Sequence, residues 1–234
     1  MYVALLWHTP NPEKAIASAA KLCYYEQADI ASLIQGFNDK DAKKYIRMLL
    51  DAGHLSPFEH ASFTFGVEGV SRSLLAQITR HRIASFSVRS QRYCSEEQFS
   101  YILPPSIKDK PFCERQYKQF MESVSFMYKA LLVNGIPKED ARMVLPNACC
   151  TRFEVTMNVR ELYHFFNLRC CSRAQWEIRE LANSMLKGCK LVSPVLFEHA
   201  GASCVSKGYC TEGKKSCGKA PTLQEILAER KSKK

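Results

Sequence analysis

Residues 80–93, RHRIASFSVRSQRY, carry more information about this protein than any other part of its sequence. A histidine stands between two arginines in Arg80–Arg82, and Ser90, Arg92 and Tyr93 follow after a short interval. A guanidinium group donates two parallel hydrogen bonds from a planar fork, which suits a phosphate. The pattern therefore predicts an anion site, most simply for a phosphorylated ligand. For any one basic residue in this segment, the alternative to ligand binding is that its charge compensates the dipole at the end of a helix.

The residues just before this segment predict a helix over Ser71–His81, capped by its first residue and apolar along one face. On that helix Gln77 would lie one turn before Arg80 and His81, so that an amide and two basic groups share a surface. The serines within residues 85–90 then indicate an irregular segment.

As a whole, the pattern resembles the signature of the flavin-dependent thymidylate synthases. That signature is an Arg-His-Arg triplet followed by seven residues and a serine, matched here by Arg80–Arg82 and Ser90. Further segments resemble the same family in the same order: an HxxPFEH segment at His54–His60, an arginine before Leu-Pro at Arg142, and residues 158–160, 166–169 and 174–179. The resemblance covers about residues 1–201, which we expect to form one domain, followed by a basic tail with cysteines over residues 202–234.

The apolar periodicity predicts strands and helices without a regular βαβ repeat. The expected strands are Tyr2–Trp7, Ala61–Val70 and Ala148–Met157. The expected helices are Pro12–Tyr25, Asn38–Ala52, Phe112–Asn134, Asn158–Asn167, a short one from Pro137, and one from a Ser172 cap to Gly188. These elements indicate an α/β (α+β) fold with a mixed sheet flanked by helices. Because no glycine-rich phosphate loop occurs, cationic side chains and helix ends would have to hold any phosphates.

The resemblance implies reductive methylation of dUMP to dTMP, with methylenetetrahydrofolate as carbon donor and NADPH as the reductant of bound FAD. It also implies that no cysteine acts as nucleophile. The difficult step is to make C5 of uracil nucleophilic, and a cation beside the pyrimidine would stabilise the negative charge that develops there. By resemblance Arg169 takes this catalytic role. Without the resemblance, a helix-end charge or a salt bridge would be the simpler interpretation of Arg169.

The same resemblance assigns the remaining site residues. Those expected to hold dUMP are Gln77, Arg80, Val88 through its backbone, Ser90, Arg92, Arg142 and Arg169. Those expected to hold FAD are His54, Ser56, Arg80, His81, Arg82, Asn158, Arg160 and His164. Ser90 has no His-Asp partner at a recognisable spacing, so we interpret it as a phosphate ligand rather than a nucleophile.

The chain departs from the family pattern in three places, one of which covers two residues. Ser87-Val88 stands where many members have Asn-Glu, so one carboxylate contact to the ligands is missing. Cys23 stands where serine is common and Arg173 where histidine is common, so their contacts at the rim of the flavin are in doubt.

The tail spaces one histidine and three cysteines as His199-x4-Cys204-x5-Cys210-x6-Cys217. Four such groups are enough to bind a structural zinc ion. The spacings are looser than the CxxC pairs of well-defined zinc sites, however. Free thiols are therefore the default, and no metal is predicted. A metal-dependent regulator built on these cysteines is the weakest of the functional alternatives.

The composition limits the class of protein. Eleven cysteines, an odd number with adjacent pairs, and an N-terminus unlike a secretory signal predict reduced thiols in a cytoplasm. No apolar run is long enough to predict a membrane span. The net charge of +10 favours anionic ligands, including nucleotides. Nucleic-acid binding is the alternative, but the chain lacks a recognition motif. The resemblance also implies a homotetramer with active sites shared between subunits.

Overall fold

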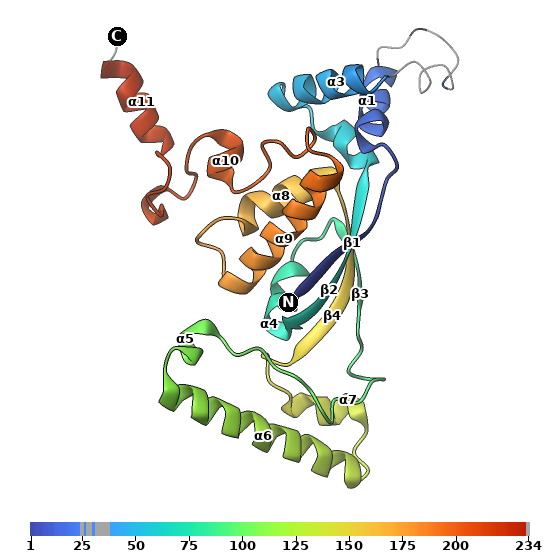
Figure 1. Ribbon diagram of the computed structural model, residues 1–234, viewed down its shortest axis with the longest axis vertical. Coiled ribbons are helices and arrows are strands. Elements are labelled where there is room, and N and C mark those ends of the chain that lie inside the picture. Colours follow the sequence, from blue (N-terminus) through green and yellow to red (C-terminus); the bar gives the residue numbers. More distant parts are fainter. Residues whose placement is uncertain (24–25, 27–29, 31–37, 233–234) are drawn as a thin grey trace. The chain divides into compact units, whose positions relative to one another are not determined.

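A computed structural model describes residues 1–23, 26, 30 and 38–232 of the chain (Figure 1). Within these residues the strands are β1 (Tyr2–His8), β2 (Ser62–Ser71), β3 (Ala84–Val88) and β4 (Cys150–Asn158). The longer helices are α1 (Pro12–Leu22), α3 (Asp39–Asp51), α6 (Pro111–Val133), α8 (Val159–Arg169), α9 (Trp176–Val192) and α11 (Leu223–Ser232). The shorter ones are α4 (Arg72–Ile78), α5 (Pro105–Lys108), α7 (Lys138–Ala141), α10 (Ser203–Lys207), and the 3-10 helices η1 (Ser56–His60), η2 (Arg142–Val144) and η3 (Gly213–Lys215).

The four strands pair in the order β1-β2-β4-β3 (Figure 1). Thr9, just after β1, donates its N–H to Ser62 at the start of β2, so these strands run antiparallel. The ends of the β2–β4 pair show the same arrangement, because Val159 donates to Ala61 and Arg72 donates to Cys149. The α/β (α+β) class with helices flanking a sheet is confirmed, but the sheet is antiparallel and not mixed, since neighbouring strands run in opposite directions.

The chain divides into two compact units. Unit 1 comprises Met1–Tyr2, Gly66–Arg80 and Phe86–Glu154, and unit 2 comprises Val3–Phe65, His81–Ser85 and Val155–Lys234. The boundary passes between the first two residues of the Arg-His-Arg triplet. Each unit is therefore described separately.

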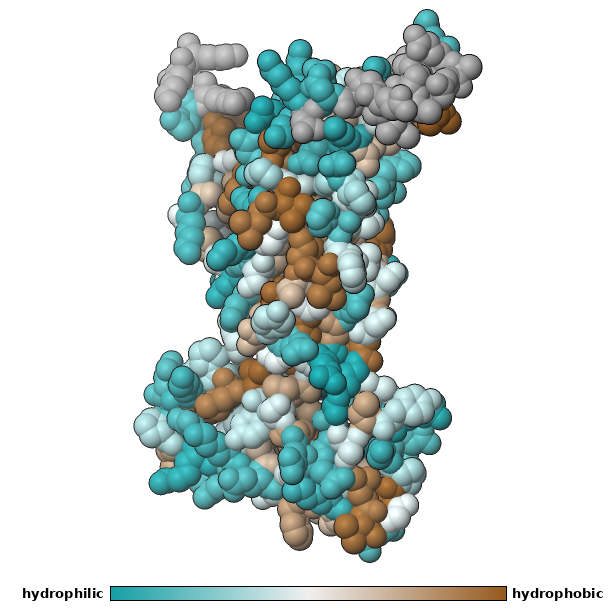
Figure 2. Space-filling view, turned by 45° about the vertical axis from the view of Figure 1, so that its right-hand side comes forward, coloured by the Kyte–Doolittle hydropathy of each residue, from teal (hydrophilic) through white to brown (hydrophobic). Residues whose placement is uncertain are grey.

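In unit 1, helix α6 buries one apolar face and exposes others. Met121, Val124 and Tyr128 are buried at helical spacing, and the Tyr128 hydroxyl accepts the Glu96 N–H at 3.2 Å. Other large apolar side chains of this helix are at the surface, among them Phe126, which is 74% exposed. Brown side chains interrupt the teal surface on the face shown in Figure 2.

Unit 2 has an aromatic centre beneath α8. The ring of Phe197 stacks on Tyr163 at 5.9 Å and meets Phe63 and Phe166 edge-on at 5.3 and 6.2 Å. Helices α8 and α9 pack side by side (Figure 1), and η1 packs against α8. Edge-on aromatic pairs add to the burial of apolar area, so this packing fixes the position of α8.

Several local predictions are confirmed. Ser71, Asn38 and Asn158 each cap a helix by accepting a backbone N–H through the side chain, as expected. Helix α6 ends at Val133, and Gly135 beyond it has a φ of 81°, which favours glycine. The predicted helix over Pro12–Tyr25 ends at Leu22 in the structure, and Tyr24–Tyr25 lie outside the described residues.

Three boundary predictions are wrong. The helix expected over Ser71–His81 stops at Ile78, where the Thr79 hydroxyl and N–H both bond to the Leu75 carbonyl and close the last turn. The segment expected to be irregular contains β3, whose backbone groups are satisfied by pairing with β4.

The third concerns the start of α9. Ser172 was expected to cap it, but the cap is Gln175, whose Oε1 accepts the N–H groups of Glu177 and Ile178. The backbone carbonyl of Ser172 instead accepts a hydrogen bond from Arg179 at 2.7 Å.

None of the helices within the described residues combines the length and apolar character needed to cross a lipid bilayer.

Candidate functional site

A buried histidine links a carboxylate to an arginine in unit 2. His81 is only 4% exposed; its Nδ1 lies 2.8 Å from Oε1 of Glu161, and its Nε2 lies 3.1 Å from Nε of Arg169. An arginine can only donate, so Nε2 of His81 accepts. The ring proton therefore sits on Nδ1 and is donated to Glu161. This arrangement determines both the tautomer of His81 and the orientation of Arg169.

Helix α8 supplies both neighbours of His81. Asn158 caps the helix and accepts the N–H of Glu161 at 2.9 Å, which holds Glu161 in the first turn. Arg169 is in the last turn, where a cation also compensates the negative end of the helix dipole. The predicted helix-end role and the contact with His81 therefore coexist at this residue.

Burial keeps His81 neutral. Removal from water lowers the pKa of His81, and the neighbouring Arg169 and His164 act in the same direction. The hydrogen bond to Glu161 acts in the opposite direction and is the second-largest effect. A neutral ring is also what the contact with Arg169 requires, because a protonated Nε2 could not accept.

His164 stands at the exposed edge of this group. Its ring lies 5.6 Å from that of His81, and one potential metal-ligand atom from each of His81, Glu161 and His164 lies within 4.8 Å of the others. Both ring nitrogens of His81 are already engaged with Glu161 and Arg169. We therefore assign no metal to this group.

Most residues predicted to hold FAD belong to unit 2. His54 and Ser56 lie at η1, which packs on α8, the helix that carries Arg160 and His164. The exposed Arg160 pairs with Glu59 of η1 at 2.5 Å. The exposed Arg160 guanidinium and the exposed Ser56 hydroxyl are suitable donors for a pyrophosphate. Of the predicted set, Arg80 alone falls in unit 1.

Unit 1 gathers two of the arginines predicted to hold dUMP around one glutamate. Nε of Arg92 lies 2.5 Å from the carboxylate of Glu139, and Nε of Arg142 donates to the backbone carbonyl of the same residue at 3.0 Å. Ser90 turns back on this segment, and its hydroxyl accepts the Arg92 N–H at 3.2 Å. The structure thus brings Ser90, Arg92 and Arg142 towards one surface.

Arg72 belongs to this cationic cluster but was missed in the sequence. Its Nη2 donates to the Arg89 carbonyl at 3.2 Å, while its Nε is buried and has no hydrogen-bond partner. Burial lowers the pKa of Arg72, and Arg142 and Arg89 act in the same direction, whereas Glu96, which pairs with Arg89, acts in the opposite direction. A buried donor without a partner is a place where an anion would be stabilised. As the first residue after a helix cap, Arg72 had no distinguishing signal in the sequence.

Gln77 and Arg80 do not form the predicted helical surface with His81. Gln77 is on α4 and donates to the Ser73 carbonyl at 3.3 Å, whereas Arg80 and His81 follow the end of the helix. Glu161 was also missed. Three residues after the Asn158 cap, it has the position of an ordinary capping-box residue.

The chain resembles known proteins over nearly its whole length. The family model described as "Thymidylate synthase complementing protein" matches residues 4–195. A protein of Clostridium tetani named flavin-dependent thymidylate synthase is 47% identical, covering 96% of each chain. A protein of Geobacter sulfurreducens with the same name is 46% identical over 98% of this chain and 99% of the relative. One of Pyrococcus abyssi, again with this name, is 42% identical over 90% and 89%.

Proposed function

Because the chain belongs to the flavin-dependent thymidylate synthase family and is an enzyme of that type, we propose that it methylates dUMP to dTMP, with methylenetetrahydrofolate as carbon donor and NADPH as the reductant of bound FAD. Beyond family membership, the orientation of Arg169 by a buried neutral histidine is the observation that carries the proposal. Bound FAD supplies the hydride that completes the methyl group.

Arg169 acts on the pyrimidine. Its guanidinium stabilises the negative charge that develops on the ring as C5 becomes nucleophilic. The contact with His81 holds the Nε edge of the guanidinium, so the plane of the fork is set before substrate arrives. An arginine orientated in this way does not have to reorganise during the reaction.

In unit 1, the cluster formed by Arg72, Ser90, Arg92 and Arg142 holds the nucleotide phosphate. Arg92, Arg142 and the Ser90 hydroxyl act as its ligands, and Gln77, Arg80 and the Val88 backbone contact other parts of dUMP. Support comes from the position of Arg92 and Arg142 around Glu139 and from the buried, unpaired Nε of Arg72. A phosphate that reaches Arg92 competes with Glu139, so binding replaces one ion pair with another.

Side chains from several segments hold the flavin, and most of them belong to unit 2. The proposed ligands are His54, Ser56, Arg80, Arg82, Asn158, Arg160 and His164. His81, whose two ring nitrogens are engaged by Glu161 and Arg169, borders the flavin without donating to it. The exposed Arg160 in the first turn of α8 suits a phosphate of FAD, and this is the support for FAD as the flavin.

No cysteine acts as nucleophile in the proposed reaction. A thiolate is the reactive form of cysteine, and burial opposes it at several positions in the chain. Burial raises the pKa of Cys149 and of Cys170 to about 12, and raises that of Cys189 as well. The proposal further includes a homotetramer with shared active sites, which size-exclusion chromatography tests. It also includes a cytoplasmic location, which cell fractionation tests.

The test of the function uses the purified chain under anaerobic conditions. We expect it to bind FAD at micromolar concentration, to oxidise NADPH faster when dUMP is present, and to form dTMP only with methylenetetrahydrofolate. Serine variants of Cys149, Cys170 and Cys189 that still fold should retain turnover. A folded sample that takes up no flavin but shifts a DNA band would overturn the proposal in favour of nucleic-acid binding.

A further inference from the structure

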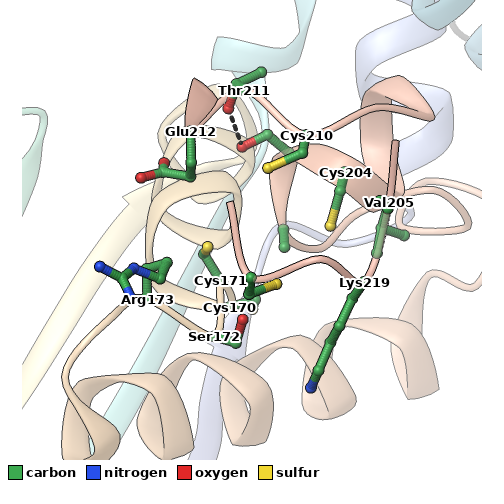
Figure 3. A pocket seen from close by; sticks show the side chains of 14 residues that line it. Cys170, Cys171, Ser172, Arg173, Cys204, Val205, Cys210, Thr211, Glu212 and Lys219 are labelled. Carbon is green, nitrogen blue, oxygen red and sulfur yellow. Dashed lines mark hydrogen bonds between the residues drawn. The ribbon is translucent and has the colours of Figure 1, made fainter. Parts of the chain in front are cut away.

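Five of the eleven cysteines line one pocket of unit 2 (Figure 3). The pocket has a volume of about 190 Å³. Its cysteines are Cys170 and Cys171, which directly follow α8, and Cys204, Cys210 and Cys217 from the C-terminal segment. His199, the histidine that accompanies the tail cysteines in the sequence, does not line it. The fold thus replaces that histidine with cysteines from a distant segment.

Hydrogen bonds attach the C-terminal segment to the end of α8. Ser206 donates to the side chain of Asn167 at 2.7 Å, and Thr211 donates to Ser203 at 3.1 Å. The N–H of Cys210 reaches the Pro221 carbonyl at 2.7 Å. Two sides of the pocket are therefore positioned by polar contacts.

Apolar burial contributes little to the tail beyond α10. Residues 211–215 are all exposed, as are Cys217, Gly218 and Lys219. A segment with so little buried apolar surface does not offset the entropy lost on ordering. Small segments of this kind are commonly held by disulfides or by a structural metal.

Charged side chains of both signs line the pocket together with the cysteines. Arg173 and Lys219 lie on opposite sides of them in Figure 3, and the carboxylate of Glu212 also belongs to the lining. Thiolates are the form in which cysteine binds metals, and nearby cations stabilise them. Cys170 and Cys171 are adjacent in the chain, so this pair offers the one further ligand that three tail cysteines need for a tetrahedral site.

We propose that this pocket is a structural zinc site whose ligands are Cys204, Cys210, Cys217 and one of the adjacent Cys170 and Cys171. Four thiolates satisfy the tetrahedral coordination that zinc adopts in closed structural sites. Among the described residues, three potential ligand atoms lie within 4.8 Å of one another at His81, Glu161 and His164 but not at the cysteines of the pocket. The cysteine sulfur atoms are therefore farther apart than in a zinc-bound site. Zinc would draw the exposed Cys217 segment inward, so that metal binding and ordering of the tail occur together.

The test measures metal in the full-length protein, independently of flavin binding and turnover. After dialysis against a weak chelator, we expect about one zinc per chain by mass spectrometry of the digested protein. Cys204→Ser and Cys217→Ser should each lower the zinc content at least fivefold. Cys113→Ser is the matched control, because Cys113 is an exposed cysteine on α6 of unit 1 and should leave zinc unchanged. Cys170→Ser and Cys171→Ser, tested singly, identify the fourth ligand, because zinc should be lost with only one of them; full zinc content in both would contradict the assignment.

A second measurement covers variants that fail to fold. Zinc is removed from the wild-type protein with a strong chelator, and limited proteolysis is followed with and without added zinc. Cleavage within residues 208–222 should become at least several-fold faster without the metal and should slow again on its return. A metal-free wild type with five thiols free in this region, a Cys–Cys bond among them, or bound iron with acid-labile sulfide would each overturn the zinc assignment.

Discussion

Nε of Arg169 donates to Nε2 of His81 at 3.1 Å, and this contact is possible only while His81 is neutral. The opposite nitrogen of the ring donates to Glu161, which is 6% exposed. A buried carboxylate thus determines the tautomer of a buried histidine, and the histidine orientates the arginine proposed to act on the pyrimidine. Glu161 is therefore a positioning residue whose effect reaches the substrate through two others.

Replacing Glu161 with leucine should uncouple this chain of contacts. Without its acceptor, the His81 proton can move to Nε2, and the ring then no longer accepts from Arg169. Loss of one hydrogen bond to a charged group corresponds to about tenfold or more in methyl transfer. Single-turnover measurements of dTMP formation check this, with dUMP affinity largely retained. Glu161→Gln keeps an acceptor oxygen and should recover much of the rate; equal rates in both variants would contradict the role in positioning.

Arg169→Lys should separate chemistry from binding. Lysine keeps the positive charge but lacks the planar fork, so the variant should retain flavin and much of its affinity for dUMP. Methyl transfer should slow about a hundredfold or more, comparable to the loss of one oxyanion-hole donor. Reduction of the flavin by NADPH should change much less, because that half-reaction does not need an activated C5. If both half-reactions slow equally, or the flavin is lost, Arg169 is structural.

Acid should destabilise the protein through His81. Burial lowers the pKa of His81 in the folded protein below its ordinary value of 6.5. Between the two pKa values, the unfolded chain therefore binds a proton at His81 and the folded protein does not. The unfolding free energy should therefore fall as pH decreases below about 6.5, until the lower native pKa is reached. Denaturant titrations across this range measure the effect. His81→Gln should flatten the dependence, whereas His199→Gln, at an exposed histidine, should leave it unchanged.

Arg142→Ala should weaken dUMP binding by about 1.5–3 kcal/mol, the range for a hydrogen bond to a charged group. Ser90→Ala should cost less and leave residual turnover, since a neutral hydroxyl contributes less than a guanidinium. Calorimetric titration with dUMP gives both values. Arg115→Ala is the control for net charge, because Arg115 lies on α6 over the ring of Phe112. Loss of chemistry with intact binding in Ser90→Ala would identify Ser90 as a nucleophile instead.

Local signals in the sequence determined the elements and several of their ends. Asn38, Ser71 and Asn158 cap helices because a short polar side chain can accept a nearby N–H whatever the rest of the fold does. The fold class follows from the same local periodicities. The prediction of an irregular segment was wrong at β3 although a local strand signal is present there, because Ala84, Phe86 and Val88 alternate with serines. Which strand β3 pairs with is decided by β4, far along the chain.

Only the tertiary structure decided which functional groups meet. His81 and Glu161 are 80 residues apart, yet the packing of α8 brings them into contact and converts an apparent capping residue into a partner of the Arg-His-Arg triplet. In the same way, Cys171 joins the tail cysteines at one pocket while His199 does not. A motif specifies which chemical groups are available within a few residues. The distance between groups far apart in the chain depends on how whole helices and strands pack, because those contacts are made between elements and not within them.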